Sequence, residues 1–171
     1  MSLNAPHSPF NVPKEYYELY ENESDLLESQ KRFYGMITNI DDNFGRLHQN
    51  VKSLGILDNT IIIFTTDNGT SNGYKYSKKD KKWLGFNAGM RGTKTSEYDG
   101  GHRVPFIIKW KKGGLFGGHN YSGLSAHVDM LPTLLSFAKI AFNSTKKIDG
   151  TDLSKHVINK SEADRMLVTD T

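Results

Sequence analysis

The sequence predicts an α/β fold in which a buried, mostly parallel sheet is flanked by helices. Residues 33–54 repeat apolar side chains at steps of three and four, which is the period of an amphipathic helix. Residues 60–66 form a continuous apolar run, which indicates a strand that is buried on both faces, as in a parallel sheet. A helix that runs directly into such a strand is typical of α/β proteins.

The N-terminal part of the chain is expected to form an extended loop followed by a long helix. Residues 4–14 contain three prolines, so we expect an extended loop there. The helix is expected to begin near Ser24 or Asp25, since either side chain can cap it. Its two internal glycines favour a helix lying on a sheet over a free-standing coiled coil. Gly55 is placed for a left-handed cap at its end. The apolar stripe consists of Phe33, Ile37, Ile40, Phe44, Leu47, Val51 and Leu54.

The remaining chain is expected to add a second strand and a second helix. Residues 70–89 contain five lysines and are expected to form a long loop. The second strand is expected over residues 104–110, followed by a glycine-rich loop. Asp129 could cap a helix that runs through about Ile140, with Pro132 in its first turn. Residues 166–168 are expected to begin another strand.

The composition is that of a globular domain. The chain has 171 residues, of which 36% are hydrophobic and 24% charged, so one domain is expected. No apolar run approaches the ~20 residues that a membrane span needs. The net charge of +3 is too small to indicate nucleic-acid binding, and we expect no nucleic-acid partner. The chain contains no cysteine, which excludes disulfides, thiolate metal sites and a cysteine nucleophile within it.

The first candidates for chemistry directly follow the apolar strand. Ligands gather at the carboxyl ends of strands in open α/β sheets, and Asp67 and Asn68 lie at such an end. A carboxylate beside an amide carbonyl offers the oxygen ligands that Ca²⁺ or Mg²⁺ prefers. Gly69 allows the backbone to turn sharply away. From these residues alone, a turn without a metal is the more frequent interpretation.

Two cationic side chains are further candidates. Lys94 lies in a loop of small residues shortly before a Gly-Gly pair, where its ammonium could hold an anion and neutralise charge on a leaving oxygen. His7 is flanked by prolines, which would hold an imidazole in place as a proton donor or anion contact. Either side chain taken alone is more often simply solvated. Arg103 is expected to form an ion pair with Asp99.

The lysine-rich segment has two interpretations. Its cations could attract a polyanion such as a sulfated glycan, with sugar rings stacked on its aromatic side chains. A solvated loop without a ligand is the alternative. The lysines are Lys75, Lys78, Lys79, Lys81 and Lys82, and the aromatic residues are Tyr74, Tyr76 and Trp83.

Taken in order, these segments resemble the sulfatase family of the alkaline-phosphatase-like superfamily. The resemblance covers most of residues 4–155, and its strength lies in the ordered set of motifs. Asp99 stands where the family usually has glutamate. The motifs are Pro-His-x-Pro at 6–9, a helix and strand ending in Asp-Asn-Gly at 34–69, Arg-Gly-x-Lys and Gly-Gly-x-Arg-Val-Pro within 91–110, and Asp-x-x-Pro-Thr-Leu-Leu at 129–135.

The resemblance implies part of an alkaline-phosphatase-like fold and a sulfuric ester hydrolase. It implies that Asp67 and Asn68 bind a metal, usually Ca²⁺ and alternatively Mg²⁺. Lys94 would contact the sulfate and the leaving oxygen, and His7 would contact the sulfate ester and protonate the leaving alcohol. The family's nucleophile is a formylglycine made within a Cys/Ser-x-Pro-x-Arg motif, which this chain lacks.

Residues 1–171 are therefore expected to be the C-terminal part of a sulfatase catalytic domain, without its nucleophile-bearing N-terminal half and inactive alone. The expected partner is a sulfate-ester substrate, including a sulfated glycan. Two alternatives stay open: a phosphonate or phosphate monoester hydrolase of the same superfamily, and a non-catalytic module that binds sulfated glycans through its lysines. The resemblance implies a periplasmic, secreted or lysosomal location.

Overall fold

The computed structural model describes residues 2–142 and 145–168, and it divides into two compact units. Each unit joins segments from distant parts of the sequence, and the division runs through the first and the last strand. Within the described residues, the first unit comprises 2–57 and 64–106, and the second comprises 58–63, 107–142 and 145–168.

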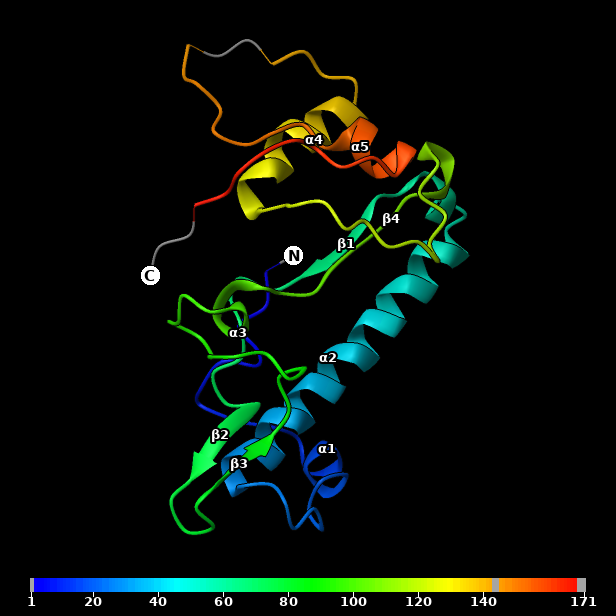
Figure 1. Cartoon of the computed structure of the whole chain (residues 1–171). Coiled ribbons are helices and arrows are strands. Elements are labelled where there is room, and N and C mark those ends of the chain that lie inside the picture. The colour runs from blue at the N-terminus through cyan, green and yellow to red at the C-terminus, as the bar shows by residue number, and fades with distance from the viewer. Residues whose placement is uncertain (1, 143–144, 169–171) are drawn as a thin grey trace. The chain divides into compact units, whose positions relative to one another are not determined.

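The described chain combines helices and strands (Figure 1), as the α/β prediction requires. One sheet pairs β1 with β4, and the other pairs β2 with β3. Because β2 and β3 are antiparallel, this second sheet departs from the expected parallel arrangement. The helices are α1 (Lys14–Glu18), α2 (Glu28–Ser53), α3 (Asp99–His102), α4 (Met130–Phe137) and α5 (Ser154–Asn159). The strands are β1 (Ile62–Thr65), β2 (Tyr74–Ser77), β3 (Lys82–Gly85) and β4 (Phe106–Lys109).

The long helix α2 begins later than its sequence suggests. The prediction of a start near Ser24 or Asp25 is wrong, since Leu27 is the capping residue. The Leu27 N–H donates to Gln30 Oε1 at 2.9 Å, and Gln30 Nε2 donates to the Leu84 carbonyl at 2.8 Å. The buried Gln30 side chain therefore joins the helix start to β3, a strand far away in sequence.

The end of α2 is as predicted. Gly55 adopts a left-handed conformation with φ of 71°. Its N–H donates to the Lys52 carbonyl at 3.0 Å, and the Ile56 N–H donates to the Val51 carbonyl at 3.3 Å. This pair of bonds is the Schellman motif, which satisfies carbonyls that the helix would otherwise leave unpaired.

The apolar stripe of α2 is covered only in part. Phe33 and Met36 are buried, and Phe44 packs edge-on against Phe64 of β1 with ring centroids 5.9 Å apart. The expectation that this helix lies on a sheet is confirmed at that contact. Other stripe positions are exposed in the described chain, namely Ile37, Leu47 and Leu54.

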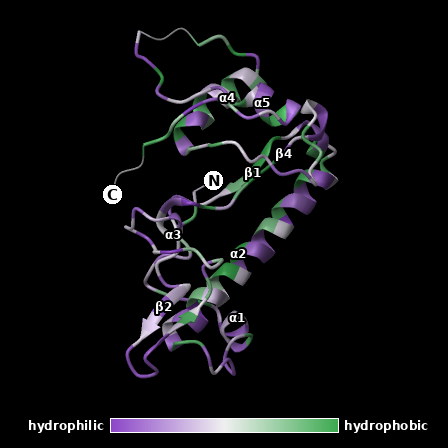
Figure 2. Ribbon diagram, in the orientation of Figure 1, coloured by the Kyte–Doolittle hydropathy of each residue, from purple (hydrophilic) through white to green (hydrophobic). Residues whose placement is uncertain are grey.

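The apolar strands are less buried than predicted. Figure 2 shows β1 as a hydrophobic segment, yet Ile62, Ile63 and Phe64 are only half-buried and Thr65 is exposed. Two residues of β4, Phe106 and Ile107, are also exposed. Burial on both faces needs neighbouring strands and covering helices, and a two-stranded sheet supplies few of them.

The lysine-rich segment is a β-hairpin, so the prediction of a loop over residues 70–89 is wrong. In its antiparallel register Tyr76 lies opposite Trp83, and Ser77 lies opposite Lys82. The prediction rested on the lysines and overlooked the alternating aromatic residues Tyr74 and Tyr76, a residue type that favours strands. The predicted strand over residues 166–168 is also wrong, because that segment is irregular and both Met166 and Val168 are exposed.

The base of the hairpin is tied to α2 through one phenol. Tyr34 donates to the Gly73 carbonyl at 2.7 Å and accepts the Phe86 N–H at 3.0 Å. Burial raises the pKa of Tyr34, although the bond from Phe86 opposes this effect. The phenol therefore stays protonated at neutral pH and donates to the hairpin.

Replacing this phenol should loosen the hairpin. We expect Tyr34→Phe to lower the free energy of unfolding by about 1–2 kcal/mol, because hairpin polar groups lose a partner. Urea unfolding followed by Trp83 fluorescence, in a Trp110→Phe background, measures this change. The matched control is Tyr98→Phe, since the Tyr98 hydroxyl makes no hydrogen bond within the described chain. Equal stability of the two variants would contradict the anchoring role of Tyr34.

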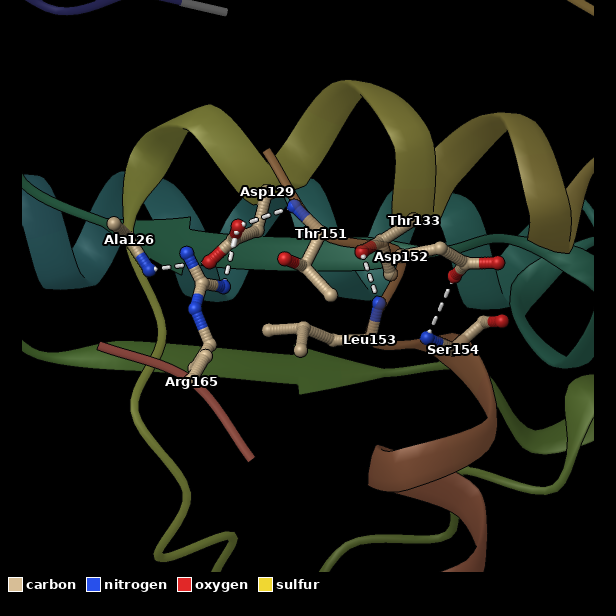
Figure 3. Close-up of polar contacts among 8 residues, drawn as sticks. All are labelled: Ala126, Asp129, Thr133, Thr151, Asp152, Leu153, Ser154 and Arg165. Atoms are coloured by element: carbon tan, nitrogen blue, oxygen red, sulfur yellow. Dashed lines mark hydrogen bonds and ion pairs between the residues drawn. The ribbon is translucent and has the colours of Figure 1, made fainter. Parts of the chain in front are cut away.

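The second unit is organised around one buried carboxylate (Figure 3). Asp129 is 0% exposed and accepts hydrogen bonds from the Ala126 and Thr151 N–H groups at 2.7 and 2.8 Å. Arg165, only 10% exposed, forms an ion pair with it at 2.7 Å. Asp129 precedes α4 as predicted, but its side chain does not cap that helix. It ties α4 to the chain before and after α5.

Of the described helices, none has both the length and the apolar character needed to cross a membrane.

Candidate functional site

The two segments that the sequence singles out lie against each other in the first unit. The Gly69 N–H donates to the Gly101 carbonyl at 2.8 Å, and the Lys94 N–H donates to the Thr70 carbonyl at 2.9 Å. These backbone bonds join the turn after β1 to the lysine-containing loop and to α3. The Asp-Asn-Gly turn and the loop of Lys94 therefore form one local structure.

Glycines allow this close approach. A Cβ atom on Gly69 would collide with the Gly100 carbonyl, and one on Gly100 would collide with the Gly92 carbonyl. Gly100 and Gly101 are buried and belong to the single turn of α3. The Gly-Gly pair thus lets the two segments pack backbone against backbone.

Asp67 and Asn68 present oxygen atoms at the end of β1. Asp67 is exposed, and within the described chain its carboxylate accepts no hydrogen bond. Asn68 Nδ2 donates to the Gly69 carbonyl at 2.9 Å, which leaves its Oδ1 available as an acceptor. Carboxylate and amide oxygens are of the kind that a hard divalent cation takes, and these two would be only a part of the six or more ligands of a Ca²⁺ ion.

The described acidic, histidine and cysteine side chains form no metal-binding cluster. Among residues 2–142 and 145–168, no group of three or more His, Cys, Asp or Glu side chains is placed to hold a metal. The described residues therefore offer two side-chain oxygens at the end of β1 and no cluster of three such ligands.

Lys94 is half-buried in a loop with a strained backbone. Its side chain forms no ion pair with any described acidic residue, so the ammonium is available to an anion. The next residue, Thr95, has φ of 69°, an unusual conformation for a β-branched residue. Strain of this kind often occurs in ligand-binding loops, where the surrounding structure holds it in place.

The arginines of this loop have other partners. Arg103 pairs with Asp99 at 3.3 Å, which confirms the predicted ion pair. The Arg91 guanidinium lies 3.5 Å from the centroid of the Tyr98 ring, a cation–π contact that the sequence analysis missed. Both arginines therefore hold the loop around Lys94, and no signal in the sequence pointed to the contact with Tyr98.

His7 is exposed, and its described contacts are local. Its N–H donates to the Asn4 carbonyl at 3.0 Å, and its Nδ1 lies 2.8 Å from the Ser8 carbonyl. Within the described residues it makes no hydrogen bond or ion pair with the turn after β1 or with Lys94. The structure thus brings together three of the four candidate residues.

An α/β scaffold thus places the side-chain oxygens of Asp67 and Asn68 at the end of β1, in the same local structure as the loop of Lys94. The sulfatase family model matches residues 1–140. The chain belongs to the sulfatase family. Its structure is part of the alkaline-phosphatase-like fold, as the sequence predicted.

Particular relatives support this assignment. The chain is 30% identical over 166 residues to an uncharacterized sulfatase, YdeN, of Escherichia coli strain K12, covering 96% of this chain and 27% of that protein. The crystal structure of Ps i-CgsB in complex with k-i-k-neocarrahexaose matches with a TM-score of 0.76 and 28% identity, over 93% of this chain and 33% of that one. The structure of BT4656 in complex with its substrate D-glucosamine-2-N,6-O-disulfate matches with a TM-score of 0.62 and 29% identity, over 79% and 24%. The chain spans a third or less of the length of these proteins.

Proposed function

We propose that this chain is part of the catalytic domain of a sulfatase and supplies its metal-binding and sulfate-contacting residues. The observation that carries the proposal is the backbone pairing of the Asp67–Asn68 turn with the loop of Lys94. This pairing brings the turn of Asp67 and Asn68 and the loop of Lys94 into one local structure. Membership of the sulfatase family and the ordered motifs support the same function.

Each candidate residue has a chemical role in this proposal. Asp67 and Asn68 would hold a Ca²⁺ ion, or alternatively Mg²⁺, which would supply positive charge for the sulfate oxygens. Lys94 would pair with the sulfate and neutralise charge on the leaving oxygen. His7 would donate a proton to the departing alcohol, which requires that its segment lie at the substrate. The formylglycine nucleophile would come from a segment outside these 171 residues.

Two of the similar structures support a proposal for the substrate class. The structure of BT4656 contains a sulfated glucosamine as its substrate, and that of Ps i-CgsB contains a carbohydrate. We therefore propose a sulfate ester of a sugar, including a sulfated glycan, as the substrate. On the basis of the family resemblance, we also propose a periplasmic, secreted or lysosomal location.

The decisive test is sulfate release by the longer protein of which we propose that this chain is part. The substrates are glucosamine 6-sulfate and, as the matched alternative, glucosamine 6-phosphate. We expect release of sulfate that is lost on chelation with EDTA and restored by Ca²⁺. The 171-residue chain alone should release none. Preferred hydrolysis of the phosphate would instead show a phosphate monoester hydrolase, and turnover by the isolated chain would contradict the proposed division of residues.

A further inference from the structure

The β2–β3 hairpin has two different faces. One face holds the buried residues Ser77 and Leu84, and the Leu84 carbonyl accepts the bond from Gln30 of α2. The other face carries three aromatic side chains, since alternate residues of a strand point to the same side. Tyr74 stacks on Trp83 with centroids 4.8 Å apart, and Tyr76 meets Trp83 edge-on at 5.8 Å.

This aromatic cluster is exposed although it is well ordered by its own contacts. Trp83 is 52% exposed and Tyr76 is 48% exposed. One face of the Trp83 ring is covered by Tyr74, so the stack presents a flat aromatic surface at a fixed position. Aromatic rings of this kind offer large contact area at low entropic cost, and the apolar faces of sugar rings stack on them.

The turn of the hairpin adds positive charge beside the aromatic cluster. Lys78, Lys79 and Lys81 lie between the two strands and form no ion pair within the described chain. Figure 2 shows this turn as hydrophilic. Its one carboxylate, Asp80, bonds to Ser77 Oγ at 2.6 Å, and Lys82 is paired with Asp25. Three unpaired lysines therefore create a local field that attracts anions.

The hairpin is also directly connected to the candidate site along the chain. The chain leaves the Asp-Asn-Gly turn at Thr70 and returns at Lys94, and the bond from the Lys94 N–H to the Thr70 carbonyl closes this excursion at 2.9 Å. At the base of the hairpin, the Phe86 N–H donates to the Gly73 carbonyl at 2.8 Å. A ligand held on the hairpin is thus attached to the same local structure that holds Lys94.

We propose that the exposed face of the β2–β3 hairpin binds a sulfated polysaccharide, with sugar rings stacked on Trp83 and sulfates paired with Lys78, Lys79 and Lys81. The choice of ligand rests on the proposed function, because a sulfatase acting on a glycan meets a chain of such groups. Lysines alone would hold a simple anion. The aromatic cluster favours a glycan because its rings offer a surface on which sugar rings can stack. The hairpin would hold parts of the polymer beyond the ester being cleaved.

Two variants separate the aromatic from the ionic contribution. Trp83→Ala removes the stacking surface, and the triple variant Lys78→Gln, Lys79→Gln, Lys81→Asn removes the charges. Asparagine is chosen because Lys81 has φ of 53°, a conformation that asparagine tolerates. The matched control is Lys52→Gln, Lys155→Gln, Lys160→Asn, which removes the same charge and includes another residue with positive φ, at 56°.

The measurements are binding of the longer protein to immobilised heparin and its hydrolysis of glucosamine 6-sulfate. We expect both hairpin variants to bind heparin about tenfold more weakly, with the salt dependence reduced only in the lysine variant. Both hairpin variants should hydrolyse glucosamine 6-sulfate as fast as the unmodified protein does. If the proposed function is wrong, the unmodified protein itself will not hydrolyse this monosaccharide, and that result is distinct from a loss of heparin binding.

Three results would overturn the inference. The first is an equal loss of heparin binding in the control variant, which would indicate net charge alone. The second is binding of desulfated heparin with unchanged affinity. The third is single-stranded DNA binding as tightly as heparin at the same salt concentration, which would indicate a general polyanion surface. Circular dichroism of each variant establishes that the hairpin variants are folded.

Discussion

Lys94→Ala should lower kcat/KM for a sulfated sugar about 100- to 1000-fold in the longer protein, the range found when a charge-stabilising donor is removed from an active site. The change removes the ammonium but keeps the backbone bond from residue 94 to the Thr70 carbonyl, so the loop should retain its shape. Because the ammonium would act most strongly on the charge that develops at the leaving oxygen, kcat should fall more than KM rises. Steady-state kinetics on glucosamine 6-sulfate measures both parameters.

The matched control is Lys52→Ala, in the last turn of α2, where the side chain is exposed. It should leave kcat/KM unchanged. A comparison of leaving groups tests this role further. The loss of kcat/KM in Lys94→Ala should be larger for the sulfate ester of a sugar alcohol than for that of an activated aryl alcohol, because the aryl alcohol departs without assistance. Equal losses with both leaving groups would refute the role assigned to Lys94, and a loss confined to KM would reduce it to substrate binding.

Asp129→Asn should destabilise the second unit by about 3–5 kcal/mol, because it leaves Arg165 buried without its counter-charge. The amide also replaces a carboxylate oxygen that accepts hydrogen bonds with a group that donates them. Trp110 packs against Phe137 of α4 with centroids 5.5 Å apart, so its fluorescence reports on this unit. Urea unfolding of the chain, in a Trp83→Phe background, measures the change.

The pH dependence of stability provides an independent check on Asp129. Burial opposes ionisation, but the hydrogen bonds from Arg165, Thr151 and Ala126 outweigh it and hold the pKa of Asp129 below its ordinary value. The contribution of the carboxylate is therefore fully present above its unfolded pKa of about 3.9. It is lost as the pH falls from there through the lower folded pKa. The variant Asp129→Asn lacks this carboxylate, so its free energy of unfolding should fall less below about pH 4 than that of the unmodified chain. The difference between the two should scale roughly with the pKa shift of Asp129.

Two further variants complete the test of this ion pair. Asp149→Asn is the matched control, because Asp149 is exposed and its removal should change stability by less than about 0.5 kcal/mol. Arg165→Met in the Asp129→Asn background should recover part of the loss, since removing both buried charges costs less than removing one. Strict additivity of the two changes would show that Asp129 and Arg165 do not act as a pair.

The family and most of the candidate site could be predicted from the sequence because they depend on short local patterns. Asp67, Asn68 and Lys94 belong to motifs whose order and spacing are visible along the chain, and the family that these motifs predicted is confirmed by the family match. The end of α2 was predictable for the same reason, since a glycine after the last turn is a local signal. The roles of His7, Lys94, Asp67 and Asn68 remain predictions that activity measurements must test.

The missed features depend on residues that are distant in sequence. The β2–β3 hairpin was hidden because its lysines suggested a solvated loop, while the pairing of Tyr76 with Trp83 decides its structure. The start of α2 depends on Gln30 reaching the Leu84 carbonyl, a contact with no signature in the helix sequence. The role of Asp129 was mistaken for a helix cap because its true partner, Arg165, lies far along the chain.

By itself, the sequence determined which residues are chemically suited to bind a metal and a sulfate, since side-chain type and motif order are properties of the chain alone. Only the tertiary structure decided that Gly69, Gly100 and Gly101 pack together and so place the Asp-Asn-Gly turn beside Lys94. It also decided the exposure of β1, because burial depends on which strands and helices cover a strand and not on how apolar it is. The physical reason is that hydrogen bonds and burial join residues through space, whereas sequence patterns report only on neighbours along the chain.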